Sequence, residues 1–251
     1  MATTHNNNIT RLCFYSLWLT ICVIQAYSTG LLADEAYYWK YAQHLSWGYF
    51  DHPPVIAAII KPGYILLQNE LGVRLFSVLM GTAFIYLLEL LTRPKRLLLF
   101  YLTIVSIGAF HFLSYLALPD IPLLFFTALF LFLHRIYLEK DSWPIALLLA
   151  VTTTLLLLSK YHGVLVIGFA ILANPRMMFR VSFWGIAVLS AAMFMPHAWW
   201  QITHDFPSIN YHLSERSTGG YKIENTLNYI LSALLVFSPV AGIVLAWHTI
   251  K

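Results

Sequence analysis

The chain has 251 residues, of which 59% are hydrophobic and only 10% are charged, and its mean hydropathy is +0.70. Soluble globular domains carry about 25% charged residues, and disordered chains carry few apolar ones, so this composition excludes both classes. Long apolar runs separated by short polar segments instead predict an integral membrane protein with several spans. The net charge of +4 does not indicate nucleic-acid binding, because the basic residues stand in short clusters between apolar runs.

The first apolar run, residues 12–33, follows a polar segment, and we expect it to be an uncleaved membrane helix. Ala26-Tyr27-Ser28 loosely fits a signal-peptide cleavage site, but the run continues past it and more spans follow. Cys13 and Cys22 would lie about 13.5 Å apart along a helix, which is too far for a disulfide. Cysteine content therefore says nothing about the redox compartment.

Residues 34–54 interrupt the apolar pattern with a polar and aromatic segment, DEAYYWKYAQHLSWGYFDHPP. Its first part predicts an amphipathic helix that lies along the membrane surface, with its aromatic side chains at headgroup level. Residues 55–68 are apolar but contain Lys61-Pro62-Gly63. Because they are too short for a span of about 20 residues, we expect an interfacial or re-entrant piece there.

Seven further apolar runs follow and, with the first, predict eight spans and a cytoplasmic amino terminus. These runs cover residues 71–91, 97–118, 121–138, 143–159, 161–173, 181–203 and 226–247. The expected fold is therefore an all-α polytopic membrane helix bundle, and we expect residues 1–251 to form a single domain with an outer loop at 28–70.

The charged residues sort to the two sides of this topology. Nine of the 15 basic residues would lie on the cytoplasmic side, as the positive-inside rule predicts: Arg11, Arg93, Lys95, Arg96, Arg135, Lys140, Arg176, Arg180 and Lys251. Eight of the 11 acidic residues would lie on the other side: Asp34, Glu35, Asp51, Glu70, Asp120, Asp205, Glu215 and Glu224. Acidic residues contribute little to orientation. Their excess therefore either marks a functional site or reflects only the polarity of loops.

Three arrangements favour a functional site. Asp34-Glu35 opens the expected surface helix, where Asp34 could alternatively serve as a helix cap. Asp51-His52 precedes two prolines, which stiffen the chain and fix how these side chains are presented. Asp120 lies between two prolines at the junction of two spans, where Pro-Asp is also a common turn signal. Several carboxylates in one water-accessible cleft suit proton abstraction or cation binding.

Two later segments carry further candidates, and several motifs are missing. Lys160 lies in an outer turn between two short runs, and a lysine that merely reaches the membrane interface is the alternative. His-acid pairs in residues 197–216 suggest a metal only weakly, because no HExxH pair is present. The sequence contains no P-loop, GxGxxG or serine nucleophile elbow, so nucleotide and serine-hydrolase chemistry has no support.

Together these segments resemble the GT-C class of membrane glycosyltransferases, specifically the protein-mannosyltransferase-like glycosyltransferase family 39 and its lipid A aminoarabinose-transferase relatives. The family pattern is an Asp-Glu after the first span, an aromatic surface helix and an aromatic-acid-X-Pro-Pro turn. Later blocks match in the same order, so that the resemblance covers about residues 12–247. These blocks are LPDIPLLFF, SKYHGVL and PHAWWQITHDFPSINYHLSERS.

The resemblance implies an enzyme that transfers a sugar, with inversion, from a polyprenyl-phosphate-linked donor to a lipid, glycan or protein acceptor. The reaction would take place on the non-cytoplasmic face of a bacterial inner or plasma membrane. Membrane lipids are expected partners, and nucleic acid is not.

Carried over residue by residue, Asp34 is implied as the catalytic base, and Asp120 as the acid opposite it that orients acceptor or sugar. The resemblance implies substrate binding by Glu35, Tyr38, His52, Lys160 and Arg216. Asp51 and His212 are implied as ligands of a divalent cation, while no cofactor is firmly expected. His52 stands where the aminoarabinose transferases carry a Lys, so a phosphate contact there loses a permanent charge.

Members of this family are usually longer, with further spans and often an outer soluble domain, which we expect this chain to lack. Two alternatives remain: a non-catalytic or truncated remnant of such an enzyme, and a multi-span transporter or flippase whose acids relay ions. A transporter predicts acids inside the spans and an internal repeat. Only Glu89 lies late in a span, and the sequence shows no repeat.

Overall fold

A computed structural model describes residues 2–211 and 223–236, and within these ranges the chain forms helices and no strand. The all-α prediction is therefore confirmed. The first half contains α1 (Ala2–Ser28), α2 (Ala33–Gln43), α3 (Val55–Leu67), α4 (Glu70–Thr92), α5 (Leu97–Ser106) and α6 (Gly108–Tyr115). The second half contains α7 (Asp120–Glu139), α8 (Trp143–Ser159), α9 (Gly163–Ala173), the 3-10 helix η1 (Pro175–Phe179), α10 (Val181–Thr203), α11 (Pro207–Asn210) and α12 (Ile223–Val236).

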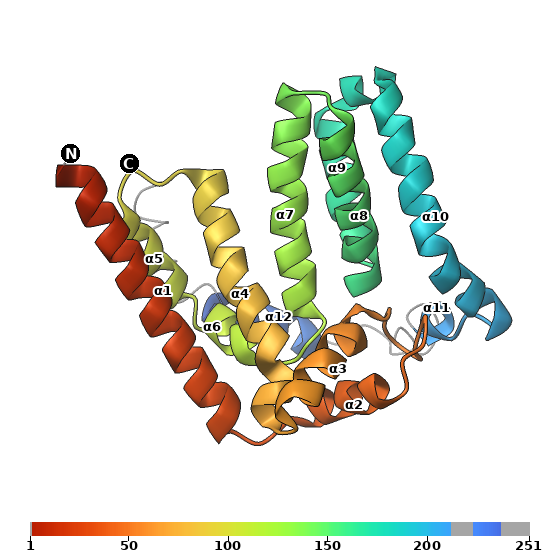
Figure 1. Cartoon of the computed structure of the whole chain (residues 1–251). Coiled ribbons are helices and arrows are strands. Elements are labelled where there is room, and N and C mark those ends of the chain that lie inside the picture. The colour runs from red at the N-terminus through yellow and green to blue at the C-terminus, as the bar shows by residue number, and fades with distance from the viewer. Residues whose placement is uncertain (1, 212–222, 237–251) are drawn as a thin grey trace.

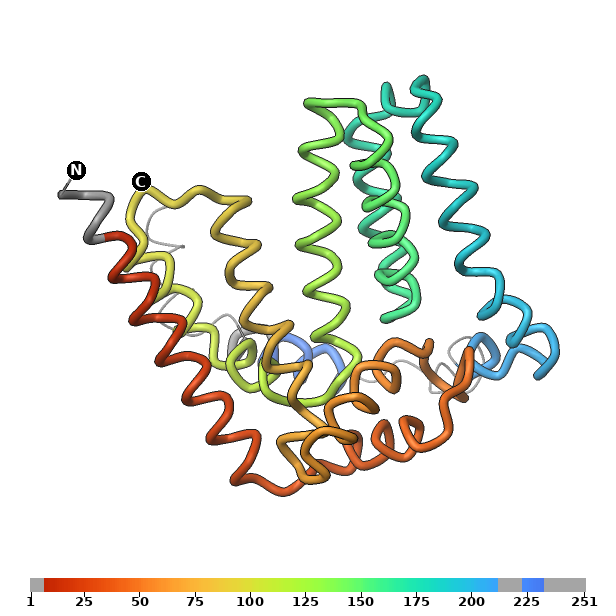
Figure 2. The backbone as a smooth tube through the Cα atoms, in the orientation of Figure 1, coloured from red at the N-terminus to blue at the C-terminus, as the bar shows by residue number. Residues whose placement is uncertain are grey.

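The long helices run between two ends of the molecule (Figure 1). We call one of them the site end, which holds the connections 29–32, 44–54, 116–119 and 160–162. The opposite, basic end holds the connections 93–96, 140–142 and 174–180. The backbone trace shows α2 crossing the site end beneath the long helices, as expected for a helix that lies along a membrane surface (Figure 2).

The structure does not confirm eight spans. Within the described residues, four helices are long and apolar enough to cross a membrane, namely Asn7–Ser28, α4, α7 and α10, and a bent pair of helices brings the number to five. The apolar helices α8 and α9 have 17 and 11 residues, which corresponds to about 25 and 16 Å at 1.5 Å per residue. Both are shorter than a hydrocarbon core of about 30 Å.

Two other predicted segments are broken or short. The predicted span 97–118 consists of α5 and α6, which are bent by 79° relative to each other. The break lies at Ile107, whose ψ of 81° falls outside the helical region. Residues 55–67 form the short helix α3, which continues through Pro62, in line with a piece too short to span. The last predicted span, 226–247, lies partly outside the described residues.

The buried side chains form three apolar clusters. One joins α7, α8, α9 and α10, a second joins α1, α4, α5 and α6, and a third lies under α2 and α3. Helix α4 connects them, because it packs against α1, α3 and α7. Only 17–44% of each span's most apolar window is buried, so the remaining apolar surface is available to lipid.

Arginines at the basic end complete the ends of two helices. Arg135 donates to the carbonyls of Leu90 and Leu91 at 3.2 and 3.0 Å, at the carboxyl end of α4. Arg180 donates in the same way to the carbonyls of Tyr137 and Leu138, at the carboxyl end of α7. Cations at these positions satisfy the last helix carbonyls and oppose the helix dipole, so the basic end has a folding role besides any role in orientation.

Candidate active site

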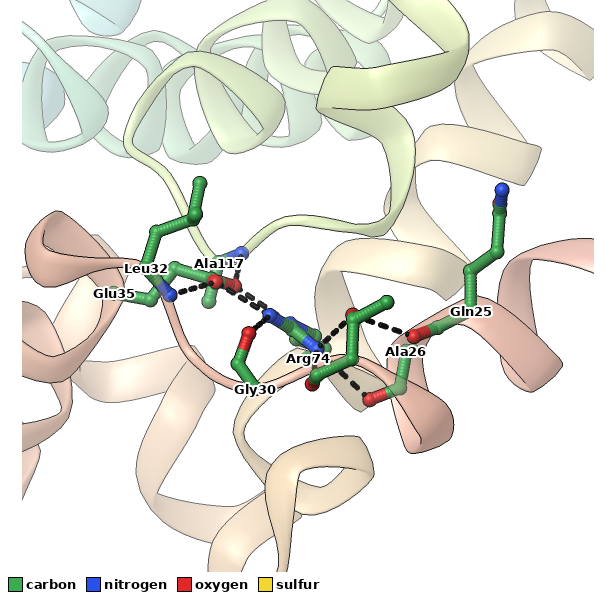
Figure 3. Close-up of polar contacts among 8 residues, drawn as sticks. Gln25, Ala26, Gly30, Leu32, Glu35, Arg74 and Ala117 are labelled. Carbon is green, nitrogen blue, oxygen red and sulfur yellow. Dashed lines mark hydrogen bonds and ion pairs between the residues drawn. The ribbon is translucent and has the colours of Figure 1, made fainter.

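A buried ion pair forms the framework of the site end (Figure 3). Glu35 in the first turn of α2 and Arg74 in the second turn of α4 both have no exposed side-chain surface. Arg74 Nε and Nη2 donate to the two carboxylate oxygens at 2.7 and 2.6 Å. The other guanidinium donors bind the carbonyls of Ala26, Thr29 and Gly30 at 2.7–3.0 Å. Such a bidentate, fully hydrogen-bonded pair is the arrangement that a buried charge requires.

This ion pair joins four segments of the chain. Glu35 also accepts the backbone N–H of Leu32 and of Ala117, each at 2.9 Å. The end of α1, the start of α2, helix α4 and the segment before Asp120 are thus fixed to one another. Glu35, which we expected to bind substrate, is saturated by protein donors and buried, so it acts by positioning its neighbours.

Asp34 lies beside this framework and faces solvent. It is not the helix cap, because Leu32 occupies the N-cap position and the Glu35 side chain accepts the backbone N–H there. Within the described residues, no hydrogen bond or ion pair engages its carboxylate. The same turn of α2 therefore presents one carboxylate to the exterior and directs the next into the protein. Asp34 remains available to accept a proton or a hydrogen bond from a substrate.

Asp51 is held by the aromatic residues of α2. Tyr37 donates to its Oδ1 at 3.3 Å. The Tyr41 hydroxyl oxygen lies 3.2 Å from the same atom, and its one hydrogen is shared between Asp51 and the Tyr37 hydroxyl. His52 Nε2 lies 3.8 Å from Asp51 Oδ2. Burial, the hydrogen bond with Tyr37 and the charge of Asp51 raise the pKa of Tyr41, so this phenol stays a protonated donor at neutral pH.

Asp120 and Lys160 form an ion pair. Lys160 Nζ, in the turn between α8 and α9, donates to Asp120 Oδ1 at 2.8 Å, and the side chains are 22% and 41% exposed. Asp120 is the first residue of α7. The lysine therefore has an acidic partner at the site end, and its remaining two ammonium hydrogens can serve a ligand.

The charges of the three acids predicted to share one face all act on the hydroxyl of Tyr38. This side chain is 6% exposed. Burial and the negative charges of Asp51 and Asp34 raise the pKa of its hydroxyl, and the charge of Asp120 contributes in the same direction. The carboxylates that act on this hydroxyl thus come from α2, from the 44–54 turn and from the start of α7. Lys160 pairs with one of them, Asp120.

Two of the expected site residues, His212 and Arg216, lie outside the described residues, so the predicted pairing of Asp51 with His212 stays a prediction. Within residues 2–211 and 223–236, no group of three or more His, Cys, Asp or Glu side chains gathers closely enough to hold a metal ion. Cys13 and Cys22 are both free, as expected from their spacing.

The sequence reasoning missed Arg74 and the phenols of Tyr37 and Tyr41 as parts of this site. A signal for Arg74 was available, since an arginine early in an otherwise apolar span needs a partner. The nearest acid in the chain is Glu70, whereas the observed partner is 39 residues away. Only the fold identifies that pair.

Comparison with known proteins adds a family. Residues 51–200 match the model of the dolichyl-phosphate-mannose-protein mannosyltransferase family. The chain is 26% identical to a lipid A galacturonosyltransferase of Rhizobium johnstonii over 252 aligned positions, which cover 93% of this chain and 52% of that protein. The chain thus spans about half the length of this curated relative. No solved structure matches the chain significantly.

Proposed function

The chain belongs to the dolichyl-phosphate-mannose-protein mannosyltransferase family of membrane glycosyltransferases, and on this premise we propose that it transfers a sugar from a polyprenyl-phosphate-linked donor to an acceptor at its site end. The observation that carries the proposal is that the charges of Asp34, Asp51 and Asp120 all act on the Tyr38 hydroxyl, while Lys160 is paired with Asp120. These carboxylates come from three separate elements, so the fold and not the local sequence brings them together.

Asp34 serves the acceptor side of the reaction. Glycosyl transfer passes through an oxocarbenium-like state, and the attacking hydroxyl must lose its proton as the new bond forms. Among the three acids, Asp34 is exposed and has no partner in the described part of the chain, whereas Asp51 and Asp120 already accept hydrogen bonds or an ion pair. It is therefore the carboxylate best placed to act as general base.

The leaving group is a phosphate, which needs donors that stabilise its growing negative charge. Lys160 uses one ammonium hydrogen on Asp120 and can give the others to a phosphate oxygen. His52 is a second donor, beside Asp51. A base on one side of the sugar and a leaving phosphate on the other correspond to a single displacement with inversion of the anomeric centre.

The acceptor and the setting follow from the same features. The relative in Rhizobium johnstonii is a lipid A galacturonosyltransferase, and we expect α2 to lie along the bilayer surface, so we propose a membrane lipid as acceptor. The basic end would face the cytoplasm by the positive-inside rule, which puts the site end on the outer face of a bacterial inner or plasma membrane. A divalent cation beside Asp51 would offset the excess of carboxylates over lysine.

A transfer assay with matched variants tests the proposal. The purified chain in proteoliposomes receives radiolabelled polyprenyl-phosphate sugars and a lipid A acceptor, and labelled lipid is measured. Asp34→Asn should abolish transfer, whereas Glu70→Gln, another exposed acid at the same end of the molecule, should retain it. Transfer at the wild-type rate by the Asp34→Asn variant would refute Asp34 as base, and no transfer by the wild type with any donor would refute the function.

A further inference from the structure

The last two turns of α10 bury polar side chains that the proposed reaction does not use. His197 is 1% exposed and Gln201 is 4% exposed. Both project from a helix that is otherwise apolar enough to span a membrane. Imidazole and amide groups are costly in such a position unless they are hydrogen-bonded, so their partners indicate what they do.

These side chains form a directed chain of hydrogen bonds. The Trp47 carbonyl, 2.6 Å from His197 Nδ1, can only accept, so Nδ1 carries the hydrogen and Nε2 of the neutral ring accepts. Tyr161 therefore donates to His197 Nε2 at 3.1 Å. Gln201 Nε2 in turn donates to the Tyr161 hydroxyl at 2.8 Å.

A second branch leads from Gln201 to the same turn. Gln201 Nε2 donates to Ser208 Oγ at 2.8 Å, and Ser208 donates to the Tyr49 carbonyl at 2.7 Å. Trp200 of α10 lies so close to Gly48 that a Cβ there would come 2.2 Å from the indole ring. The end of α10 therefore packs directly on Gly48. His197 binds the carbonyl of Trp47 before this glycine, and Ser208 binds the carbonyl of Tyr49 after it.

The two ends of this chain lie next to the two charged groups of the site. Trp47 and Tyr49 precede Asp51 in the 44–54 turn, and Tyr161 follows Lys160, which pairs with Asp120. Burial raises the pKa of Tyr161 and hydrogen bonds with Ser208 and Gln201 lower it, while the charge of Asp51 raises it. Within the described residues, α2 holds the 44–54 turn from the other side, because the Tyr49 hydroxyl lies 3.2 Å from the Tyr41 carbonyl and can donate to it.

We propose that His197, Tyr161 and Gln201 are positioning residues, which fix the separation between the Asp51–His52 turn and the Asp120–Lys160 pair. This inference rests on the proposed glycosyl transfer. A displacement of about 1 Å in a reacting geometry can cost about a hundredfold in rate. The hydrogen-bond chain therefore sets the rate of the transfer step through the geometry of the site, while the affinity for substrate depends on other contacts.

Kinetics of matched variants test this. His197→Phe and Tyr161→Phe should each lower kcat about tenfold to a hundredfold with KM nearly unchanged, and the double variant should be no slower than the slower single one, because both break the same chain. His197→Asn should recover part of kcat, since its amide can still donate to the Trp47 carbonyl.

Ser190→Ala is the control. It removes another buried hydrogen bond of α10, two turns away, which Ser190 donates to the Ala150 carbonyl at 3.1 Å. This variant should leave kcat unchanged.

Hydrogen–deuterium exchange of residues 44–53 provides a readout that does not need activity. Exchange should become faster in His197→Phe and Tyr161→Phe and stay as in the wild type in Ser190→Ala. If the wild type transfers no sugar, the proposed function fails, and exchange alone then decides on the positioning chain. Should His197→Phe fail to fold, Tyr161→Phe, which lacks one oxygen atom, carries the test.

The inference is overturned by any of three results. One is unchanged kcat in Tyr161→Phe, and another is equal losses of kcat in His197→Phe and Ser190→Ala. The third is exchange of residues 44–53 that is the same in all variants.

Discussion

Each end of the molecule holds a buried glutamate that binds an arginine, but the two pairs differ in their surroundings. At the site end, Glu35 and Arg74 are both completely buried, and protein groups take up their hydrogen bonds. At the basic end, Glu89 is 4% exposed, but its partner Arg11 is 42% exposed. Glu89 also accepts from the hydroxyls of Tyr15 and Tyr101 at 3.2 and 2.7 Å.

This difference predicts that the stability of the site end depends more on its ion pair than the stability of the basic end does. Removing one member of a buried pair leaves an uncompensated charge in a medium that cannot solvate it, and neither Glu35 nor Arg74 can reach water. Arg11 can turn to solvent when its partner is changed, and two neutral phenols remain around position 89. The site end therefore depends on its ion pair, which joins the segments that carry Asp34 and Asp120.

The largest effect should come from Arg74→Ala. It leaves Glu35 charged and buried, and we expect a loss of about 3–5 kcal/mol in the free energy of unfolding. Arg11→Ala, at the exposed pair, should cost at most about 1 kcal/mol. Denaturant titration in detergent micelles or nanodiscs measures both, and equal losses in the two variants would contradict the comparison.

A smaller effect is expected for Glu89→Gln. The amide keeps the shape of the side chain but gives up charge-assisted hydrogen bonds from Arg11 and the two tyrosines, which corresponds to about 1.5–3 kcal/mol. Sugar transfer per folded molecule should stay at the wild-type rate, because the basic end takes no part in the chemistry. A loss of transfer without a loss of stability would show that this end has a catalytic role.

The smallest effect on stability is expected for Lys160→Met. The methionine keeps the apolar stem but removes the ammonium group from a partly exposed pair, which costs at most about 1 kcal/mol. The transfer rate should nevertheless fall about a hundredfold, because the proposed donor to the leaving phosphate is lost. Lys40→Met, an exposed lysine of α2, is the matched control and should retain activity.

Much of the architecture was predictable, because apolar runs and their polar breaks report helix positions directly. The helix α2 at one end, the short helix α3 and the separation of the connections 44–54 and 116–119 from the connections 93–96 and 174–180 all appear in the structure (Figure 1). These features depend on local composition and on one-dimensional charge order. The number of spans was overestimated, because the run 161–173 was counted as a span although it is shorter than the about 20 residues that a span needs, and its helix has only 11 residues. The break at Ile107 inside the run 97–118 was not visible in the apolar pattern.

The site was only partly predictable for a related reason. Motifs identified the acids, but they could not distinguish Asp34, which faces solvent, from Glu35, which is buried. That distinction depends on Arg74, 39 residues further along the chain, and on the N–H of Ala117. The phenols that bind Asp51 and the contact of His197 with the 44–54 turn likewise require the tertiary arrangement.

The central claim is that the exposed carboxylate of this end performs chemistry while its buried neighbour maintains structure. Asp34→Asn and Glu35→Gln, measured for sugar transfer per folded molecule together with the free energy of unfolding, test it most directly. We predict that Asp34→Asn lowers transfer at least about a hundredfold and leaves stability within about 0.5 kcal/mol of the wild type, whereas Glu35→Gln destabilises the protein. Wild-type transfer by Asp34→Asn, or equal destabilisation of both variants, would contradict this claim.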